Sequence, residues 1–265
     1  MGGLFSSVLE RSWTCDLDIS SKSFILSSRQ PLHGCQNALT DMQNIATRIV
    51  SFPAGQSKTA GWFWIRETMA RQSERSAATI DGILSAAKKL FMSRGFDAVS
   101  IDDIAAAVGI AKGGVYHHFS SKQSIFETVL DRAQAELAVQ LNSRLAANKG
   151  PRTPETIAMN TYAYLKAASE PGLRRLILID GPVVMGLQRW REMDDRHFFE
   201  SIHSGIVEIM GPKASRKQID SAARLVTGAI IEAALATGAS HNPVKVARVY
   251  CATLRSMLYG LQKDS

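Results

Sequence analysis

The sequence predicts an all-α protein, and three observations support this fold class. Apolar residues recur at the i, i+3, i+4, i+7 spacing of a buried helical face in successive segments between residues 76 and 261. Ser100 begins one of these segments with a polar side chain three positions later, as helix-capping residues do. Glycine or proline ends the segments, as at Gly109, Pro151 and Gly211. We therefore expect a series of helices joined by short turns.

Composition and charge limit the classes of protein to which the chain can belong. Its 265 residues are 45% hydrophobic, enough for a sizeable core in one or two domains, and its net charge of +7 favours polyanionic partners. Cys15, Cys35 and Cys251 are scattered and lack the spacing of a zinc site, so we expect no metal and no cofactor. No apolar run approaches the roughly 18 residues that span a bilayer. We expect a cytoplasmic protein with no membrane partner.

Residues 1–74 form the first of three parts and differ from the others. They hold three of the four tryptophans and many serines, and they show no sustained period of 2 or 3.6. We expect an extension that is disordered, or an over-long reading of the gene with Met69 as the true start. A regulatory arm is the other possibility, although it has no cluster of arginines suited to a DNA minor groove.

Residues 75–137 form the second part, for which we expect three helices. One apolar stripe between Ser76 and Arg94 predicts the first helix, which should pack across the back of the two that follow. Ser100 with Asp103 then makes a capping box at the start of a short helix that ends at Gly109. Another short helix runs from about 111 to 119. Two helices around such a turn form a helix-turn-helix, whose second helix can lie in the major groove of DNA.

The outer face of this second short helix suits phosphate. No acidic residue occurs between Ile104 and Phe126, so the face is polar and cationic. Glycines allow a helix to approach nucleic acid closely, while lysine, tyrosine and histidine donate to phosphate oxygens. The candidate DNA contacts are Ser100, Lys112, Gly113, Gly114, Tyr116, His117 and Lys122.

The stretch from Ile110 to Phe119, followed by Ser121 and Lys122, resembles the recognition helix of the tetracycline-repressor (TetR) family of bacterial regulators. The resemblance covers roughly residues 77–137. It implies a homodimer that binds a palindromic double-stranded DNA operator and leaves it when an unknown small-molecule effector binds. Repression is the usual outcome in the family.

Two positions depart from the pattern of the TetR family. Members often have serine or threonine at the position of Ala111 and a side chain at that of Gly114. This chain therefore lacks two hydrogen-bonding groups, and Lys112 and the backbone of Gly113 are the best candidates to contact base edges.

Residues 138–265 form the third part, a helical bundle for ligand binding and dimerisation. Ser120 with Gln123 predicts the cap of a long helix that links this part to the second. Breaks at Pro171 and Pro182 then predict kinked helices that leave room for a pocket. The candidate ligand contacts are Met185, Trp190 and Phe198 as walls, and Arg189 and His197 as partners of an anionic ligand. For each of these residues, an ordinary place in the core or on the surface is the alternative.

Two further segments resemble the ligand-binding half of some TetR members, namely residues 180–182 and 190–192. We expect the first, Asp180-Gly181-Pro182, to set a turn.

Regular stripes of small and apolar residues mark the last two helices, which begin near Ser215 and Pro243. The stripes run from Ile219 to Ala234 and from Ala247 to Leu261. We expect these helices to pair with their copies in a second subunit as a four-helix bundle, which suits two DNA half-sites. The alternative is that both stripes fill a core within one chain.

An enzyme is the least favoured class. Ser85 and Lys88 match the S-x-x-K pattern of serine acyl enzymes, but the accompanying elements are absent and the pair lies within an ordinary amphipathic helix. No dinucleotide, P-loop, hydrolase or zinc-protease motif occurs, so we expect no catalytic residues. A non-specific DNA-binding protein is a second alternative, for which a more basic surface would be expected.

Overall fold

The computed structural model describes residues 13–18, 23–28, 58–147 and 150–263. The chain divides into two compact units, Met1–Arg71 and Gln72–Ser265. In the first unit, β1 (Trp13–Asp18) pairs with β2 (Ser23–Ser28) in an antiparallel hairpin. Six-residue strands are too short to show sustained alternation, so the sequence does not predict them.

The long helix α2 (Lys58–Arg94) begins well before Ser76, where the sequence places the first helix. No proline occurs between these positions to stop it, and an exposed ion pair of Glu67 with Arg71 at 2.6 Å adds an i,i+4 contact. The rest of the predicted extension, apart from the hairpin, lies outside the described residues. Its expected disorder and the alternative start at Met69 therefore stay predictions.

Helices make up the second unit, as the sequence predicts. In chain order after α2 they are α3 (Ile101–Val108), α4 (Lys112–His118), α5 (Lys122–Ala147), α6 (Pro154–Ala168), α7 (Pro171–Arg174), the π-helix η1 (Arg175–Asp180), α8 (Gly181–Met185), α9 (Leu187–Asp194), the π-helix η2 (Asp195–Phe199), α10 (Glu200–Met210), α11 (Arg216–Ala239) and α12 (Pro243–Lys263).

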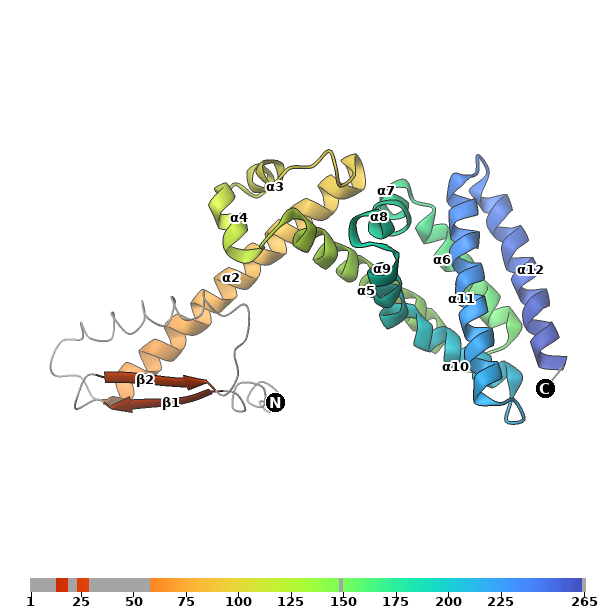
Figure 1. Cartoon of the computed structure of the whole chain (residues 1–265), viewed down its shortest axis with the longest axis horizontal. Coiled ribbons are helices and arrows are strands. Elements are labelled where there is room, and N and C mark those ends of the chain that lie inside the picture. The colour runs from red at the N-terminus through yellow and green to blue at the C-terminus, as the bar shows by residue number, and fades with distance from the viewer. Residues whose placement is uncertain (1–12, 19–22, 29–57, 148–149, 264–265) are drawn as a thin grey trace. The chain divides into compact units, whose positions relative to one another are not determined.

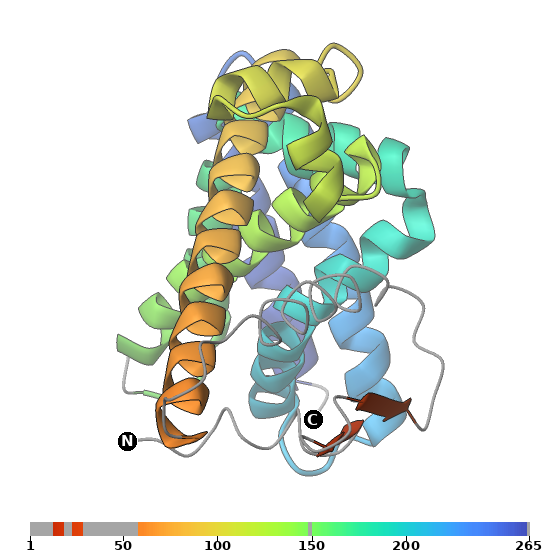
Figure 2. The ribbon, with the colours of Figure 1, turned by 90° about the vertical axis from the view of Figure 1, so that its left-hand side faces the viewer.

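Three aromatic rings lie at the centre of the predicted helix-turn-helix. Phe91 of α2, Phe96 of the next turn and Phe126 of α5 have ring centroids 5.2 to 5.8 Å apart, within the usual range for tilted and edge-to-face pairs. Ile104 of α3 and Val115 of α4 are fully buried in the same core. Figure 2 shows α3 and α4, in yellow and yellow-green, gathered at the end of α2.

The cap of α5 differs from the prediction by one residue. Because Lys122 is the first helical residue, Ser121 rather than Ser120 precedes the helix. The Ser121 hydroxyl accepts the N–H of Ser124 at 3.0 Å, and the Ser124 hydroxyl accepts the N–H of Ser121 at 3.2 Å. The predicted pairing of Ser120 with Gln123 was therefore wrong.

The chain also turns at a different residue from the one predicted in the middle of the bundle. Pro182 lies in the first turn of α8, which continues from η1 with helical backbone at Asp180 and Gly181. The sharp change of direction comes at Gly186, whose φ of +79° favours glycine.

Helices α11 and α12 run side by side (Figure 1) and pack on α6 and α10. Their predicted stripes face this core. The buried members are Ala222, Ala223, Val226, Ala233, Ala234, Ala247, Leu254 and Leu258. These side chains cannot form an interface with a second subunit, because they are already covered within the chain. Among the described helices, α11 alone is long and apolar enough to cross a membrane by composition, and its packing is that of a bundle helix.

Candidate nucleic-acid interface and sensor region

The geometry of the helix-turn-helix follows from its caps. The Ser100 hydroxyl accepts the N–H of Asp103 at 3.1 Å and donates to the Asp103 carboxylate at 2.5 Å. These hydrogen bonds to Ser100 hold the pKa of Asp103 below its usual value. Gly109 takes a left-handed conformation, with φ +75° and ψ +30°, and ends α3. The predicted capping box and turn are confirmed, and the Ser100 side chain acts within the protein.

Four of the predicted DNA contacts share the exposed face of α4. Lys112, Gly113, Tyr116 and His117 are all exposed, and a Cβ added to Gly113 would meet no other atom within 4 Å. Gly114 differs, because a Cβ there would lie 3.6 Å from the side chain of Ile110. Gly114 therefore faces the protein.

A carboxylate that the sequence pattern did not reveal reaches this face from α3. The Lys112 ammonium donates to the Asp102 carboxylate at 2.8 Å, and this hydrogen bond raises the pKa of Lys112. The stretch without acidic residues starts at Ile104, two positions after Asp102, so counting along the sequence did not detect the pair. Its outward position on α3, opposite the buried Ile101 and Ile104, was the available signal.

Lys122 occupies a different position from the outward one predicted. Its ammonium donates to the carbonyls of Phe96 and Val99, both at 2.8 Å, and lies 4.1 Å from the centroid of the Phe96 ring. An ammonium has three donors, so at most one remains for a phosphate. The geometry assigns Lys122 mainly to holding the turn before α3.

The three apolar side chains among the five predicted ligand contacts are buried or partly buried. Met185 and Trp190 are buried, and the Trp190 indole N–H donates to the carbonyl of Ile177 at 2.8 Å. Phe198 is partly buried, with its ring 5.7 Å from that of Tyr164.

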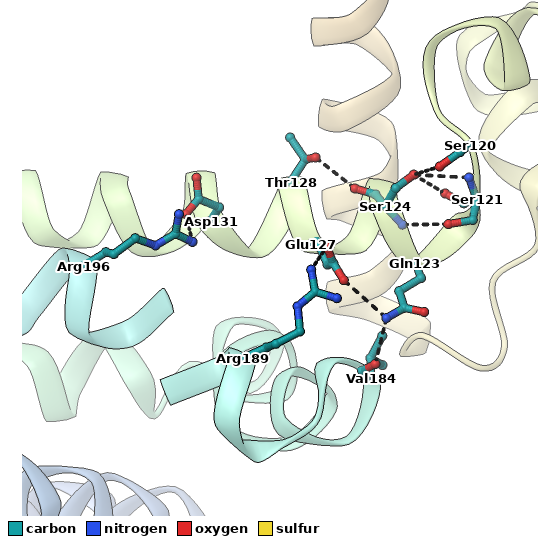
Figure 3. A network of polar contacts seen from close by, with 10 residues as sticks. All are labelled: Ser120, Ser121, Gln123, Ser124, Glu127, Thr128, Asp131, Val184, Arg189 and Arg196. Carbon is teal, nitrogen blue, oxygen red and sulfur yellow. Dashed lines mark hydrogen bonds and ion pairs between the residues drawn. The ribbon is translucent and has the colours of Figure 1, made fainter. Parts of the chain in front are cut away.

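The two residues predicted to meet an anionic ligand, Arg189 and His197, instead join α9 and η2 to α5. Arg189 donates to Glu127 at 2.9 Å, and His197 lies 2.9 Å from Asp131. Figure 3 shows Arg189 and Arg196 directed at the Glu127 and Asp131 carboxylates of α5, with Gln123 reaching the Val184 carbonyl. An anionic ligand would have to displace these carboxylates.

Sequence reasoning missed a buried polar group between α5 and α9. Gln134 is 0% exposed and Asp194 is 4% exposed, and the Gln134 amide donates to the Asp194 carboxyl at 3.3 Å. Burial, and then the charge of Asp195, raises the pKa of Asp194 to about 7. The signal was a polar residue between Leu130 and Leu137 on the buried stripe of α5.

Ser85 and Lys88, the residues that match the S-x-x-K pattern, both lie on α2. Lys88 donates to Glu136 of α5 at 2.5 Å, while Ser85 lies exposed on α2. Within the described ranges, no three His, Cys, Asp or Glu side chains are grouped as metal ligands.

Comparison with known families gives two matches along the chain. The model described as "Bacterial regulatory proteins, tetR family" matches residues 83–129, and "Tetracyclin repressor-like, C-terminal domain" matches residues 155–261. Together they cover more than half of the 265 residues.

Individual relatives agree with these matches. The chain is 35% identical over 75 residues to the HTH-type transcriptional repressor BepR of Brucella suis, covering 27% of this chain and 36% of BepR. It is 47% identical over 47 residues to the icaADBC regulator IcaR of Staphylococcus aureus, covering 18% of this chain and 25% of IcaR. The chain thus spans well under half the length of these curated relatives.

A solved structure matches a larger part of the chain. The crystal structure of a TetR-family transcriptional regulator from Pectobacterium atrosepticum superimposes with a TM-score of 0.58 at 25% identity, covering 71% of this chain and 96% of that one. With both family models matched in order on a helix-turn-helix followed by a helical bundle, the chain belongs to the TetR family of bacterial regulatory proteins.

Proposed function

We propose that the chain is a sequence-specific DNA-binding transcriptional repressor. The observation that carries the proposal is the exposed face of α4, where Lys112, Gly113, Tyr116 and His117 stand together on a helix fixed by the α3 cap and the Gly109 turn. Such a helix can enter a major groove, with side chains donating to phosphates and base edges. BepR and IcaR, by their names, are a repressor and a negative regulator.

The repressor acts as a homodimer through the outer faces of α11 and α12. Large apolar side chains exposed on these faces include Leu225, Leu235 and Val249. They lie opposite the stripes that fill the core, so the same two helices offer one face to the chain and another to a partner. A two-fold pair would place two α4 helices on half-sites about 34–36 Å apart.

A small molecule in the C-terminal bundle releases the DNA by favouring one spacing of the α4 helices over another, which requires tighter binding to one state. Met185, Trp190 and Phe198 remain candidates for the apolar wall of that site. The contacts of Arg189 and His197 with α5 make these two residues weaker candidates.

Fluorescence anisotropy with the purified chain tests the DNA-binding proposal. The probes are the DNA upstream of its own gene and a scrambled control, each titrated across a salt series. A repressor of its own promoter should prefer the native sequence and keep that preference as salt rises. Equal binding that collapses with salt on both DNAs would support a non-specific DNA-binding protein instead.

A further inference from the structure

Three buried polar side chains meet inside the C-terminal bundle. Gln134 comes from α5, Tyr164 from α6, and Asp194 from the last position of α9. All three are at most 6% exposed. Tyr164 is close enough to Asp194 for their charges to interact, and this proximity adds to burial in raising the pKa of the tyrosine hydroxyl. The phenol therefore stays protonated and can donate.

The hydrogen bonds of this cluster are incomplete within the protein. The one contact between Gln134 and Asp194 is long, at 3.3 Å, and the Gln134 carbonyl oxygen has no partner among the described residues. The Trp190 indole is satisfied by the Ile177 carbonyl, whereas Asn160 Oδ1, Arg174 Nε and Thr237 Oγ1 also lack partners among the described residues. A buried acceptor left without a donor destabilises a fold, so such a group calls for a ligand or water.

The backbone also changes its winding at this cluster. Asp194 immediately precedes η2, and π-helical turns inside longer helices frequently mark functional sites. Phe198 lies in η2 and packs edge-on against the Tyr164 ring. The three polar groups thus adjoin an aromatic pair, as expected of a site for a molecule with an apolar body and a polar end.

The charges determine which polar end fits. The Gln134 carbonyl oxygen is an acceptor without a partner among the described residues, and the Asp194 carboxyl is a second acceptor in its ionised form. The cations of α9 and η2 are directed elsewhere, with Arg189 on Glu127 and Arg196 on Asp131. Arg191 is exposed and lowers the pKa of Asp194 less than burial raises it. An anion placed here would face the Gln134 oxygen and the ionised form of Asp194, whereas a hydrogen-bond donor would give the Gln134 oxygen its missing partner.

We propose that Gln134, Asp194 and Tyr164 form the polar end of the effector site, and that the effector is a small aromatic molecule that bears an amine or hydroxyl donor and no negative charge. The assignment rests on the proposed function, in which a small molecule controls DNA binding. It replaces the anionic ligand that the sequence predicts through Arg189 and His197.

Thermal unfolding of the full-length protein tests the assignment. The probes are aromatic amines and phenols, each paired with the carboxylate of matching size, for example phenethylamine with 3-phenylpropionate. The variants are Asp194→Asn, which removes the charge, and Gln134→Met, which removes the carbonyl oxygen at similar volume. Gln188→Met, at an exposed position of α9, is the matched control. Circular dichroism establishes that each variant is folded.

The expected result is that amines or phenols raise the melting temperature while their carboxylates do not. Gln134→Met should weaken binding of both donor classes by roughly tenfold or more, and Asp194→Asn should weaken binding of the amines. Gln188→Met should leave both unchanged. The proposal is overturned if only carboxylates stabilise the protein, if neither cluster variant alters binding by donors, or if no donor binds.

DNA binding by the ligand-free protein is measured separately on the same samples. If DNA binding fails while donor binding depends on the cluster, the regulator proposal fails and the ligand site stands. If DNA binding holds and donors do not bind, the ligand-site proposal fails and the regulator proposal stands.

Discussion

The Asp180 carboxylate accepts the backbone N–H of Phe96 at 2.9 Å, which joins the end of η1 to the turn before α3. From the other side, Lys122 binds the carbonyl of the same residue at 2.8 Å. Arg175 of η1 adds a contact with the Ser93 carbonyl at 2.7 Å. The turn that positions α3 and α4 is therefore held by side chains of α5 and η1, and a movement of η1 would reach the DNA-binding face through Asp180.

Removing this acceptor should destabilise the fold. Asp180→Ala leaves the partly buried Phe96 N–H without a partner, and we expect the free energy of unfolding to fall by about 1–3 kcal/mol in urea denaturation. Asp180→Asn is the control, since its amide oxygen can still accept. Equal losses in both variants would show that the charge matters rather than the acceptor.

The pair of Lys112 with Asp102 should restrain DNA binding. Asp102→Asn frees the ammonium and removes a negative charge that faces phosphate, so we expect a few-fold tighter binding to all DNA and a steeper salt dependence. Asp81→Asn makes the same charge change on α2, where Asp81 pairs with Arg132, and serves as the control. If both variants bind DNA more tightly by a similar factor, the effect comes from net charge and not from the pair of Lys112 with Asp102.

Lys112 and Tyr116 should differ in what they contribute on DNA. Tyr116→Ala should weaken binding to all sequences alike, and Lys112→Ala should also reduce the preference for operator over mismatched DNA. Anisotropy titrations on both DNAs measure the two effects. Equal losses for Lys112→Ala on matched and mismatched sites would exclude it from base reading.

The dimer proposal predicts a sensitive position on α11. Leu225 is 73% exposed, and Leu225→Glu should convert a dimer into a monomer at micromolar concentration by burying an unpaired charge at the interface. Val139 of α5 is 65% exposed outside the proposed interface, so Val139→Glu should leave the dimer intact. Analytical ultracentrifugation measures the oligomeric state of both variants. A monomeric wild-type protein at micromolar concentration would contradict the dimer proposal.

Gly181 should tolerate no side chain. A Cβ there would lie 2.9 Å from Trp190 Cδ1 and 3.2 Å from the Leu176 carbonyl, and the buried indole is held by its own hydrogen bond. Gly181→Ala should cost about 1–3 kcal/mol of stability. Gly82→Ala is the control, because its Cβ would meet Val108 at an ordinary 3.6 Å and should be neutral or stabilising. A stable Gly181→Ala variant would mean that Trp190 can move.

Asp194 should make stability depend on pH. Burial raises its pKa to about 7 in the folded chain, from an ordinary value of 3.8. Between these values the unfolded chain has lost the proton that the folded chain keeps, so stability falls as pH rises from about 4 to about 7 and then levels off. The upper bound of the fall is about 4 kcal/mol. Asp194→Asn should flatten this part of the curve in urea denaturation at successive pH values. Parallel curves would show that Asp194 ionises normally.

The sequence by itself determined the features that depend on neighbours along the chain. The Ser100 cap, the turn at Gly109 and the exposure of Lys112, Tyr116 and His117 follow from residue type and helical spacing over a few positions. For the same reason, the order of helices in the second unit was predictable from the sequence. The residue at which α2 starts and the residue that caps α5 were not.

Tertiary structure decided every feature that depends on residues distant along the chain. Periodicity shows that a stripe on α11 is buried but not against which partner, and the fold placed Ala223 and Val226 in the core of their own chain. Pairing of Lys112 with Asp102, and of Gln134 with Asp194, requires helices to be brought together at particular distances. Side-chain spacing along one helix carries no information about these distances, because packing between helices sets them.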